Sequence, residues 1–491
     1  MTLKSRVLDI GDLSINSDQV KLVEPDNQCG RYASLSHCWG SSRHFLTTRD
    51  TMEELKCGIK ISELPQTFQD AIFIAREVGL RYIWIDSLCI CQDDKEDWER
   101  EAANMASIYS NATITISARC ASNDSIGFLN ARPKRKYVSL PYISNGTAGH
   151  VLAFDIPIGH AARGHRYVDA ADEPLSERAW ALQERYLSQR ILHFDTSQVV
   201  FECKHHYITE DGYKHPWKLD WFNTTDTGIL GHPHFYYRGI KSWANIVFHY
   251  SSLKLTRPSD KLPALAGLAR KFAEARASTG HAETQYVAGL WRDNMIEGLS
   301  WQCIGGRGSY PAEYRAPSWS WAAIDGDVSI TALGNWHNVA TVESVHVDVQ
   351  GQNPYGEVAG GWIRLKAILV RLTKSWVRSP DADKIPLKRN IRLKVEGGDS
   401  FGYYSGFDVK ESIDQDRIDE MDLYMLPLAY RDETESGKTA FSLIVQPHKR
   451  DSLDTEVCFR RMGFIFISDL DVIDSWTSKP ADVKFQSITL I

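Results

Sequence analysis

The sequence of 491 residues has no uninterrupted run of about 18 apolar residues, the length that a membrane-spanning helix needs. Its first residues, MTLKSRVLDI, lack the long apolar core of a secretory signal peptide. Cysteine is also sparse. The nine cysteines are scattered and odd in number, and they form no dense pattern of the kind found in disulfide-rich proteins. Free thiols are typical of a reducing compartment, so we expect a cytoplasmic protein without a membrane span.

Spacings typical of zinc ligands are missing as well. Cys89 and Cys91 form a C-x-C pair, and Cys203 precedes His205 and His206, but no paired C-x2-C segments occur. We therefore expect no metal site. The formal net charge of −7 opposes a chain-wide nucleic-acid footprint, so nucleic acid is not an expected partner.

Two hydrophobic periodicities alternate in the first quarter of the chain. Runs typical of strands and apolar spacings typical of helices follow each other as strand 31–37, helix 64–80, strand 81–86, helix 93–112 and strand 113–118. This order predicts a parallel sheet with right-handed crossovers. The fold class that we expect for this part is α/β.

The pattern changes twice further along the chain. Residues 175–194 read as a helix that Ser176 caps, followed by a strand, and 198–203 reads as the hairpin partner of that strand. Trp319 and Trp321 alternate with serine, so both indoles should point to one face, as in a core. Three regions are expected, namely an α/β domain over 1–205, a mainly helical segment over 206–310 and a β-rich region over 311–491.

Polar side chains follow the ends of the predicted parallel strands. The first strand runs into His37 and Cys38, the second ends at Asp86, and Cys89 comes shortly after. Parallel neighbours bring their carboxyl ends to one edge of the sheet, where ligands bind in such folds. We therefore expect an imidazole, a carboxylate and a thiol on a common rim.

His37, Asp86 and Cys89 are the candidate catalytic residues, and each has a packing alternative. His37 could pair with a residue of the next strand or be a hydrogen-bonded core residue. Asp86 could act as a base, orient His37 as in a catalytic triad, or be an N-cap or turn aspartate. Cys89 could be a nucleophile near a helix N-terminus or a buried thiol. Such a rim would suit a hydrolase or transferase for acyl or glycosyl groups of a small molecule.

Candidate substrate-binding residues surround this rim. They are Cys38, Trp39, Ser87, Gln92, Arg178 and Glu184. Cys38 could also be a small apolar filler, and Gln92 a cap for the following helix. Arg178 could pair with Asp86 or bind a ligand carboxylate or phosphate. Glu184 is a candidate for the acid that a glycohydrolase needs, provided that its helix faces the rim.

Three long blocks resemble the signature blocks of the fungal HET (heterokaryon incompatibility) domain. They are YASLSHCWG, GLRYIWIDSLCICQDDKEDWEREAANMASIYSNATITISA and ERAWALQERYLSQRILHF, and they span roughly residues 30–203. The later segments RAPSWSWAAIDG and RRMGFIFIS are similar to what commonly follows that domain. The resemblance implies an intracellular protein of a filamentous fungus, acting in non-self recognition with cell death as the outcome.

The same resemblance implies a flavodoxin-like sheet, distantly similar to the TIR signalling module, which sometimes cleaves NAD. NAD is therefore a candidate substrate, with no bound cofactor expected. In TIR-type NAD-cleaving enzymes the key glutamate lies in a helix after a sheet strand, whereas RCASNDSIGFLN, which follows 113–118, contains none. A P-loop, propeller repeats and ankyrin repeats are missing, so the expected partner is a second copy or another fungal protein.

Overall fold

The computed structural model describes residues 5–11, 17–24, 30–40, 45–132, 137–144, 146–154, 173–212, 214, 243–278, 285–306, 308–331, 333, 335–376, 391–395, 404–409, 421–433, 437–448, 457–468, 470–477 and 484–491. These residues divide into two compact units, the first reaching Lys214 and the second starting at Trp243. Residues 215–242, part of the region expected to be mainly helical, lie outside the described residues.

Nine strands of the first unit form one mixed sheet among the described residues, in the order β11-β10-β9-β6-β3-β5-β1-β2-β4. The four strands β9, β6, β3 and β5 run parallel, and the outer strands pair antiparallel. The strands are β1 (Val7–Asp9), β2 (Gln19–Val23), β3 (Tyr32–Ser36), β4 (Ile59–Lys60), β5 (Tyr82–Trp84), β6 (Ile114–Ser117), β9 (Arg190–Phe194), β10 (Val199–Cys203) and β11 (Tyr207–Thr209).

The predicted alternation of strands and helices between residues 31 and 118 is confirmed, and so is the parallel pairing of the three strands. β3 lies between β5 and β6. The chain therefore passes from β3 to its neighbour on one side, β5, and then crosses to its neighbour on the other side, β6, so the strand order reverses at β3. The register places Ser36, Ser117 and His193 in one row at the carboxyl ends of β3, β6 and β9. In open α/β sheets this reversal point is where ligands bind.

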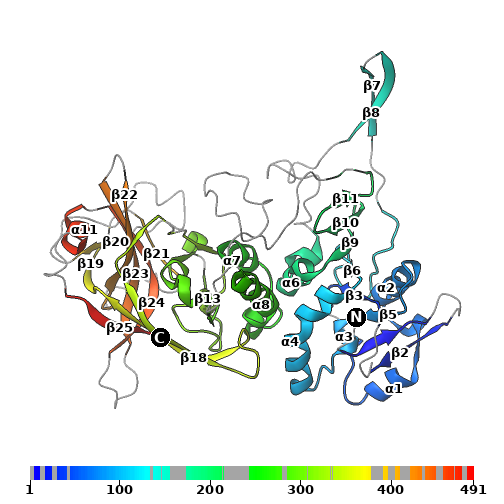
Figure 1. The fold of residues 1–491 in the computed structure, drawn as a ribbon, viewed down its shortest axis with the longest axis horizontal. Coiled ribbons are helices and arrows are strands. Elements are labelled where there is room, and N and C mark those ends of the chain that lie inside the picture. Colours follow the sequence, from blue (N-terminus) through cyan, green and yellow to red (C-terminus); the bar gives the residue numbers. More distant parts are fainter. Residues whose placement is uncertain are drawn as a thin grey trace. The chain divides into compact units, whose positions relative to one another are not determined.

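Helices cover both faces of the parallel strands. His37 contacts Phe68 of α2 on one face, and Ser36, its neighbour in sequence, contacts Glu184 of α6 on the other. α4 and α6 lie side by side (Figure 1). The helices are α1 (Met52–Cys57), η1 (Ile61–Glu63), α2 (Gln66–Glu77), α3 (Asp86–Cys89), α4 (Lys95–Asn111), η3 (Pro174–Glu177) and α6 (Ala179–Leu187).

Two expected helix caps are wrong. The N-cap of α4 is Asp94, whose carboxylate accepts from the amides of Glu96 and Asp97, so Gln92 does not cap this helix. Ser176 does not cap α6, because it lies inside the short 3-10 helix η3 and α6 begins only after Arg178.

A separate hairpin is formed by β7 (Tyr137–Ser144) and β8 (Thr147–Phe154), which pair only with each other among the described strands. It belongs to the long connection from β6 to β9, which also contains α6. Because this connection is long, α6 lies far along the sequence from β6, the strand that it follows, although it covers the same sheet.

The second unit is built around a ten-stranded sheet of described residues, and it also holds α7 and α8. Trp319 and Trp321 are fully buried in it, which confirms their predicted core position. Its helices are α7 (Trp243–Ser251), η4 (Pro258–Lys261), α8 (Pro263–Ser278), η5 (Arg292–Asn294), α9 (Met295–Gly298), η6 (Ile304–Gly306), η7 (Trp321–Ala323) and α11 (Leu470–Thr477).

Its strands come mostly after residue 310, as the β-rich pattern predicts. They are β12 (Tyr286–Val287), β13 (Leu290–Trp291), β14 (Trp301–Cys303), β15 (Val328–Ile330), β16 (His337–Asn338), β17 (Thr341–Val349), β18 (Val358–Ala367), β19 (Val370–Trp376), β20 (Ile391–Val395), β21 (Tyr404–Phe407), β22 (Tyr424–Glu433), β23 (Gly437–His448), β24 (Cys458–Ile467) and β25 (Gln486–Leu490). In neither unit does a described helix combine the length and the apolar character required to cross a membrane.

Candidate functional site at the carboxyl edge of the parallel strands

His37 follows β3 directly and is buried on the α2 face of the sheet. Its ring meets Phe68 edge-on, with 5.1 Å between the ring centroids. Its Nδ1 lies 3.7 Å from Oδ1 of Asp86, within the range of an ion pair but too long for a hydrogen bond. The structure therefore brings His37 to the residue of the next strand that sequence reasoning selected for it.

Asp86 opens the four-residue helix α3 and is the meeting point of several predicted residues. Its Oδ2 accepts a hydrogen bond of 2.9 Å from the indole of Trp39, and its Oδ1 accepts one of 2.8 Å from the amide of Ser87. Gln92 donates from its side chain to the backbone carbonyl of Asp86 at 3.2 Å. Four of the predicted residues thus converge on this carboxylate and its turn.

Cys89 occupies a different environment, inside the core at the end of α3. Its sulfur accepts from the amide of Ile85 at 3.5 Å, and its carbonyl accepts from Nε of Arg6 at 2.9 Å. Burial raises the pKa of the Cys89 thiol to about 12. A nucleophilic cysteine needs the opposite shift, toward the thiolate, so these contacts favour the packing alternative for Cys89.

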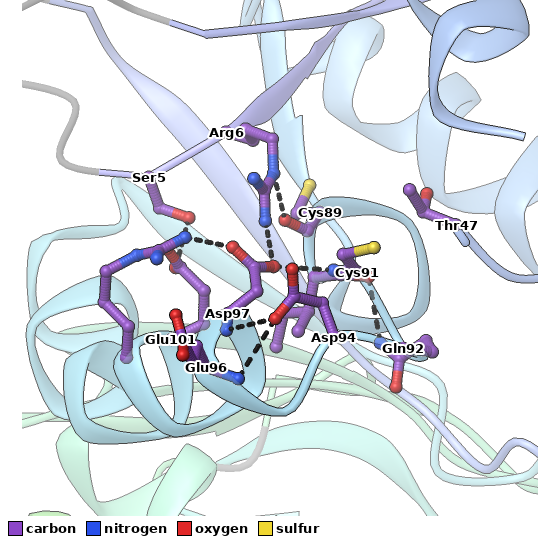
Figure 2. Close-up of polar contacts among 12 residues, drawn as sticks. Ser5, Arg6, Thr47, Cys89, Cys91, Gln92, Asp94, Glu96, Asp97 and Glu101 are labelled. Carbon is purple, nitrogen blue, oxygen red and sulfur yellow. Dashed lines mark hydrogen bonds and ion pairs between the residues drawn. The ribbon is translucent and has the colours of Figure 1, made fainter. Parts of the chain in front are cut away.

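Figure 2 shows the polar cluster to which Cys89 belongs. Arg6 extends from the start of β1 between the carbonyl of Cys89 and the carboxylate of Asp97, and it binds both. Ser5 donates to Glu101 at 2.6 Å, and the amide of Cys91 donates to Asp97 at 2.8 Å. These bonds hold the start of α4 against β1, and they give the cluster a structural role.

Glu184 lies on the other face of the sheet, where α6 turns its buried side toward the end of β3. It is 4% exposed, and its carboxyl group accepts a hydrogen bond from the hydroxyl of Ser36. The hydroxyl of Tyr109, which donates to the carbonyl of Leu35 at 3.1 Å, lies close to the same carboxyl group. Burial raises the pKa of Glu184 to about 7, with a further contribution from Asp86, against the opposing charge of Arg178. The condition set for Glu184, that its helix face the rim, is met.

Arg178 stands at the N-terminus of α6 and links both faces of the site. It donates from Nη1 to the backbone carbonyl of His37. Its charge acts on Cys38 and Glu184, lowering the pKa of each, although burial keeps the pKa of the Cys38 thiol above its usual value. No ion pair joins Arg178 to Asp86 among the described residues, so that alternative for Arg178 is wrong.

Comparison with known proteins agrees with this architecture. Residues 32–184 match the family model described as heterokaryon incompatibility protein (HET). The chain carries a HET domain. Neither the comparison with curated proteins nor that with solved structures finds a match for the chain.

The match covers most of the site, from the first residue of β3 to Glu184. β1 and β2 lie before the matched residues and β9, β10 and β11 lie after them, and these strands complete the sheet. No group of three or more His, Cys, Asp or Glu side chains in the described parts of the chain is arranged to hold a metal ion.

Sequence reasoning missed two hydroxyls near the carboxyl group of Glu184, those of Ser36 and Tyr109. Strand alternation could have found Ser36, because residues with its parity on β3 face away from His37. Tyr109 lies in the predicted helix 93–112, and its distance in sequence from Glu184 gave no signal of their proximity.

A second buried polar group, also missed, lies on β9 and β10 beside the HET segment. Glu202 accepts from His193 at 2.7 Å and from Arg185 at 2.9 Å. Although burial alone would raise the pKa of Glu202, the charge of Arg185 and the bond from His193 lower it to about 2. Burial, with the charge of Arg119, lowers the pKa of His193 to about 4, so a neutral His193 donates to an ionised Glu202.

Proposed function

We propose that this protein is an effector of heterokaryon incompatibility in a filamentous fungus, acting in the cytoplasm after non-self recognition and leading to cell death. We further propose that its HET domain acts by cleaving an N-glycosidic bond, with NAD as the substrate. The observation that carries the second statement is Glu184, a buried carboxyl group with a pKa near 7 at the reversal point of the sheet.

The order of the parallel strands supports the comparison with flavodoxin-like and TIR-like sheets. Numbered along the chain, β3, β5, β6 and β9 lie side by side in the order 2-1-3-4, which is the beginning of the flavodoxin order. α6 belongs to the connection that follows the third of these strands. Glu184 therefore occupies a helix after a sheet strand, the position of the key glutamate in TIR-type NAD-cleaving enzymes.

The chemistry needs a carboxyl group that exists in both protonation states near neutral pH. As a carboxylate, Glu184 would stabilise the positive charge that develops on the ribose as the bond from C1′ to nicotinamide breaks. Nicotinamide leaves with the bonding electron pair as a neutral molecule. Water adds to C1′, and its proton passes to Glu184 and then to solvent, so the products are ADP-ribose, nicotinamide and one proton.

The cytoplasmic assignment has support from the thiols. All eight cysteines within the described residues are free, as expected in a reducing compartment. The catalytic assignments of His37, Asp86 and Cys89 remain predictions. Of these residues, His37 and Asp86 lie together at the rim, whereas the burial of Cys89 argues against a catalytic role for its thiol.

The test is incubation of the purified full-length chain with NAD, with release of nicotinamide followed by chromatography. Glu184→Gln should lower the rate about 100-fold or more, because it removes the acid–base group. Glu177→Gln is the matched control, since Glu177 is an exposed acid in η3, just before α6. An inactive wild-type chain, or an E184Q variant as active as the wild type, would refute the enzymatic proposal.

A second candidate function, self-association, is favoured by the hairpin of β7 and β8. Residues 137–154 contain no Asp, Glu, Lys or Arg. Seven large apolar side chains of the hairpin are between 48% and 76% exposed, namely those of Tyr137, Val138, Leu140, Tyr142, Ile143, Val151 and Leu152. The neighbouring cross-strand pairs Leu140–Val151 and Ser139–Leu152 point to opposite faces, so both faces carry apolar residues. Strands with two apolar faces are typical of buried sheets, and we propose that a second copy covers them.

Self-association is tested by analytical ultracentrifugation of the full-length chain. Replacing both Leu140 and Leu152 with Asp should convert an oligomeric wild type into a monomer, because each face then carries a charge that is costly to bury. Phe73→Asp is the control, as Phe73 is a 55% exposed apolar residue of α2 outside the hairpin. A monomeric wild type at micromolar concentration, or an oligomer that both variants leave unchanged, excludes this candidate.

A further inference from the structure

Two buried basic side chains, Lys261 and Arg315, are held together in the second unit. Lys261 is the last residue of η4, and Arg315 donates from Nη1 to the carbonyl of Pro258 in the same 3-10 helix at 3.2 Å. Arg315 also donates from Nε to the carbonyl of Ala322 in η7 at 2.7 Å. Lys261 is 3% exposed and Arg315 is 6% exposed. The backbone of two short helices thus fixes the guanidinium group of Arg315, and Lys261 belongs to one of these helices.

Aromatic rings form the surroundings of the Lys261 ammonium group. Its Nζ lies 5.8 Å from the ring centroid of Tyr250 and 5.9 Å from that of Trp321. Each ring is fixed by its own hydrogen bond. The hydroxyl of Tyr250 donates to the carbonyl of Lys261 at 2.7 Å, and the indole of Trp321 donates to the carbonyl of Gly289 at 2.8 Å. The rings attract the cation but offer it no hydrogen-bond acceptor of full strength.

Only one of the two cations forms a direct ion pair with a carboxylate among the described residues. Oδ1 of Asp325 forms an ion pair with Nη1 of Arg315 at 2.8 Å, but the side chain of Asp325 is 46% exposed. Nη2 of Arg315 has no hydrogen-bond partner among the described residues, and no ion pair of the Lys261 ammonium group occurs among them. Burial, followed by the charge of Arg315, lowers the pKa of Lys261 to about 8, although Asp325 and Asp327 act in the opposite direction.

We propose that Lys261 and Arg315 form a binding site for a small oxyanion, the carboxylate or phosphate group of a metabolite. Buried cations with unused donors are costly unless an anion pairs with them. One oxyanion could accept from Nη2 of Arg315 and Nζ of Lys261 together, which are the charge-assisted hydrogen bonds that such groups form most strongly. The site lies in the second unit and is independent of the catalytic proposal for the HET domain.

The experiment measures the thermal unfolding of the full-length chain in increasing inorganic phosphate or acetate, with sodium chloride holding the ionic strength constant. A ligand that binds only the folded state raises the unfolding temperature in a saturable way. We expect this for the wild type with at least one of the two anions, and the more effective one identifies the group that the site prefers. Lys261→Met should weaken the apparent affinity about tenfold or more.

Matched variants separate binding from general effects of charge. Lys271→Met removes a half-exposed lysine of α8 that pairs with Glu274, and it should respond to the anions as the wild type does. Lys261→Arg keeps the charge and should retain most of the response, so it serves if K261M folds poorly. The proposal is overturned if neither anion stabilises the wild type, or if K261M responds like K271M. Glu184→Gln should leave the response intact, so this test does not depend on enzymatic activity.

Discussion

Glu184 shows how far the surroundings of a single residue can change its chemistry. The hydroxyl of Ser36 donates to its carboxyl group, the hydroxyl of Tyr109 lies close by, and Arg178 supplies a nearby positive charge. These interactions favour the carboxylate, but burial and the repulsion from Asp86 leave the pKa at about 7 instead of 4.5. An acid with this pKa changes its charge in the range in which the protein would work.

The raised pKa has a consequence for stability. Because the folded pKa lies above the ordinary one, the stabilisation by the protonated form is complete below about pH 4.5 and is lost as the pH rises to about 7. Relative to Glu184→Gln, the wild type should lose about 3 kcal/mol of unfolding free energy over this window. Urea unfolding of both proteins from pH 4.5 to pH 8 measures the difference, and parallel pH profiles would contradict the assignment.

The candidate site could be predicted only in part from single residues. The proximity of His37 and Asp86 followed from the ends of two parallel strands, and the geometry bears it out. Cys89 follows Asp86 by three residues, but its bonds lead to Ile85 and Arg6, away from the rim. The short helix α3 turns successive side chains toward different sides, which residue spacing alone does not reveal. The position of Cys89 near a strand end therefore did not predict where its side chain points.

At the scale of elements, the segment after β6 docks onto α2 through backbone amides. Phe128 and Leu129 donate to Oδ2 of Asp70 at 2.7 Å and 3.1 Å. The preceding residue, Gly127, has a φ of +73°. A Cβ atom there would lie 2.6 Å from both Oδ2 of Asp70 and Cγ of Gln66, so glycine is required by backbone conformation and by space.

Two glycine substitutions separate these requirements. Gly79, at the end of α2, also has a φ of +73° but has nothing within 4 Å of its virtual Cβ atom. Gly79→Ala should therefore cost about 1 kcal/mol from backbone strain alone. Gly127→Ala should cost about 3 kcal/mol, because crowding against Asp70 is added. Denaturant unfolding of the two variants measures both losses, and equal losses would show that the docked segment yields to the added methyl group.

The main elements of the first unit were readable from the sequence, because α2 and α4 are long amphipathic helices and β3, β5 and β6 are apolar runs. β1 was not predicted. It has three residues, and its antiparallel pairing with β5 depends on a contact between distant parts of the chain. A strand as short as β1 carries too little local pattern, so only the assembled sheet shows where it lies.

At the scale of the whole molecule, the family resemblance was confirmed. The residues at which the family match begins and ends differ from those that bound the first compact unit. The match covers residues 32–184, whereas the first unit extends over described residues from Ser5 to Lys214. The segment directly after residues 113–118 contains no glutamate. Glu184 lies on α6, later in the same long connection, after the hairpin of β7 and β8.

The basic pair of the second unit illustrates the same limit of sequence reasoning. Lys261 lies in a segment that read as helical, and Arg315 precedes the buried tryptophans of SWSW. Neither residue is unusual alone. Only the hydrogen bond from Arg315 to η4 reveals that the two cations share one buried place.

Arg6 precedes the family match, and this has a practical consequence for work on an isolated HET domain. A fragment trimmed to residues 32–184 would lose Arg6, one of the two arginines that pair with the buried Asp97, and would leave one side of β5 without its backbone partner. At the opposite border, β6 would lack β9. Unpaired strand edges pair with the edges of other chains, so such a fragment would precipitate. A fragment that starts ahead of Ser5 and continues past β11 would keep β5 paired with β1 and β6 paired with β9.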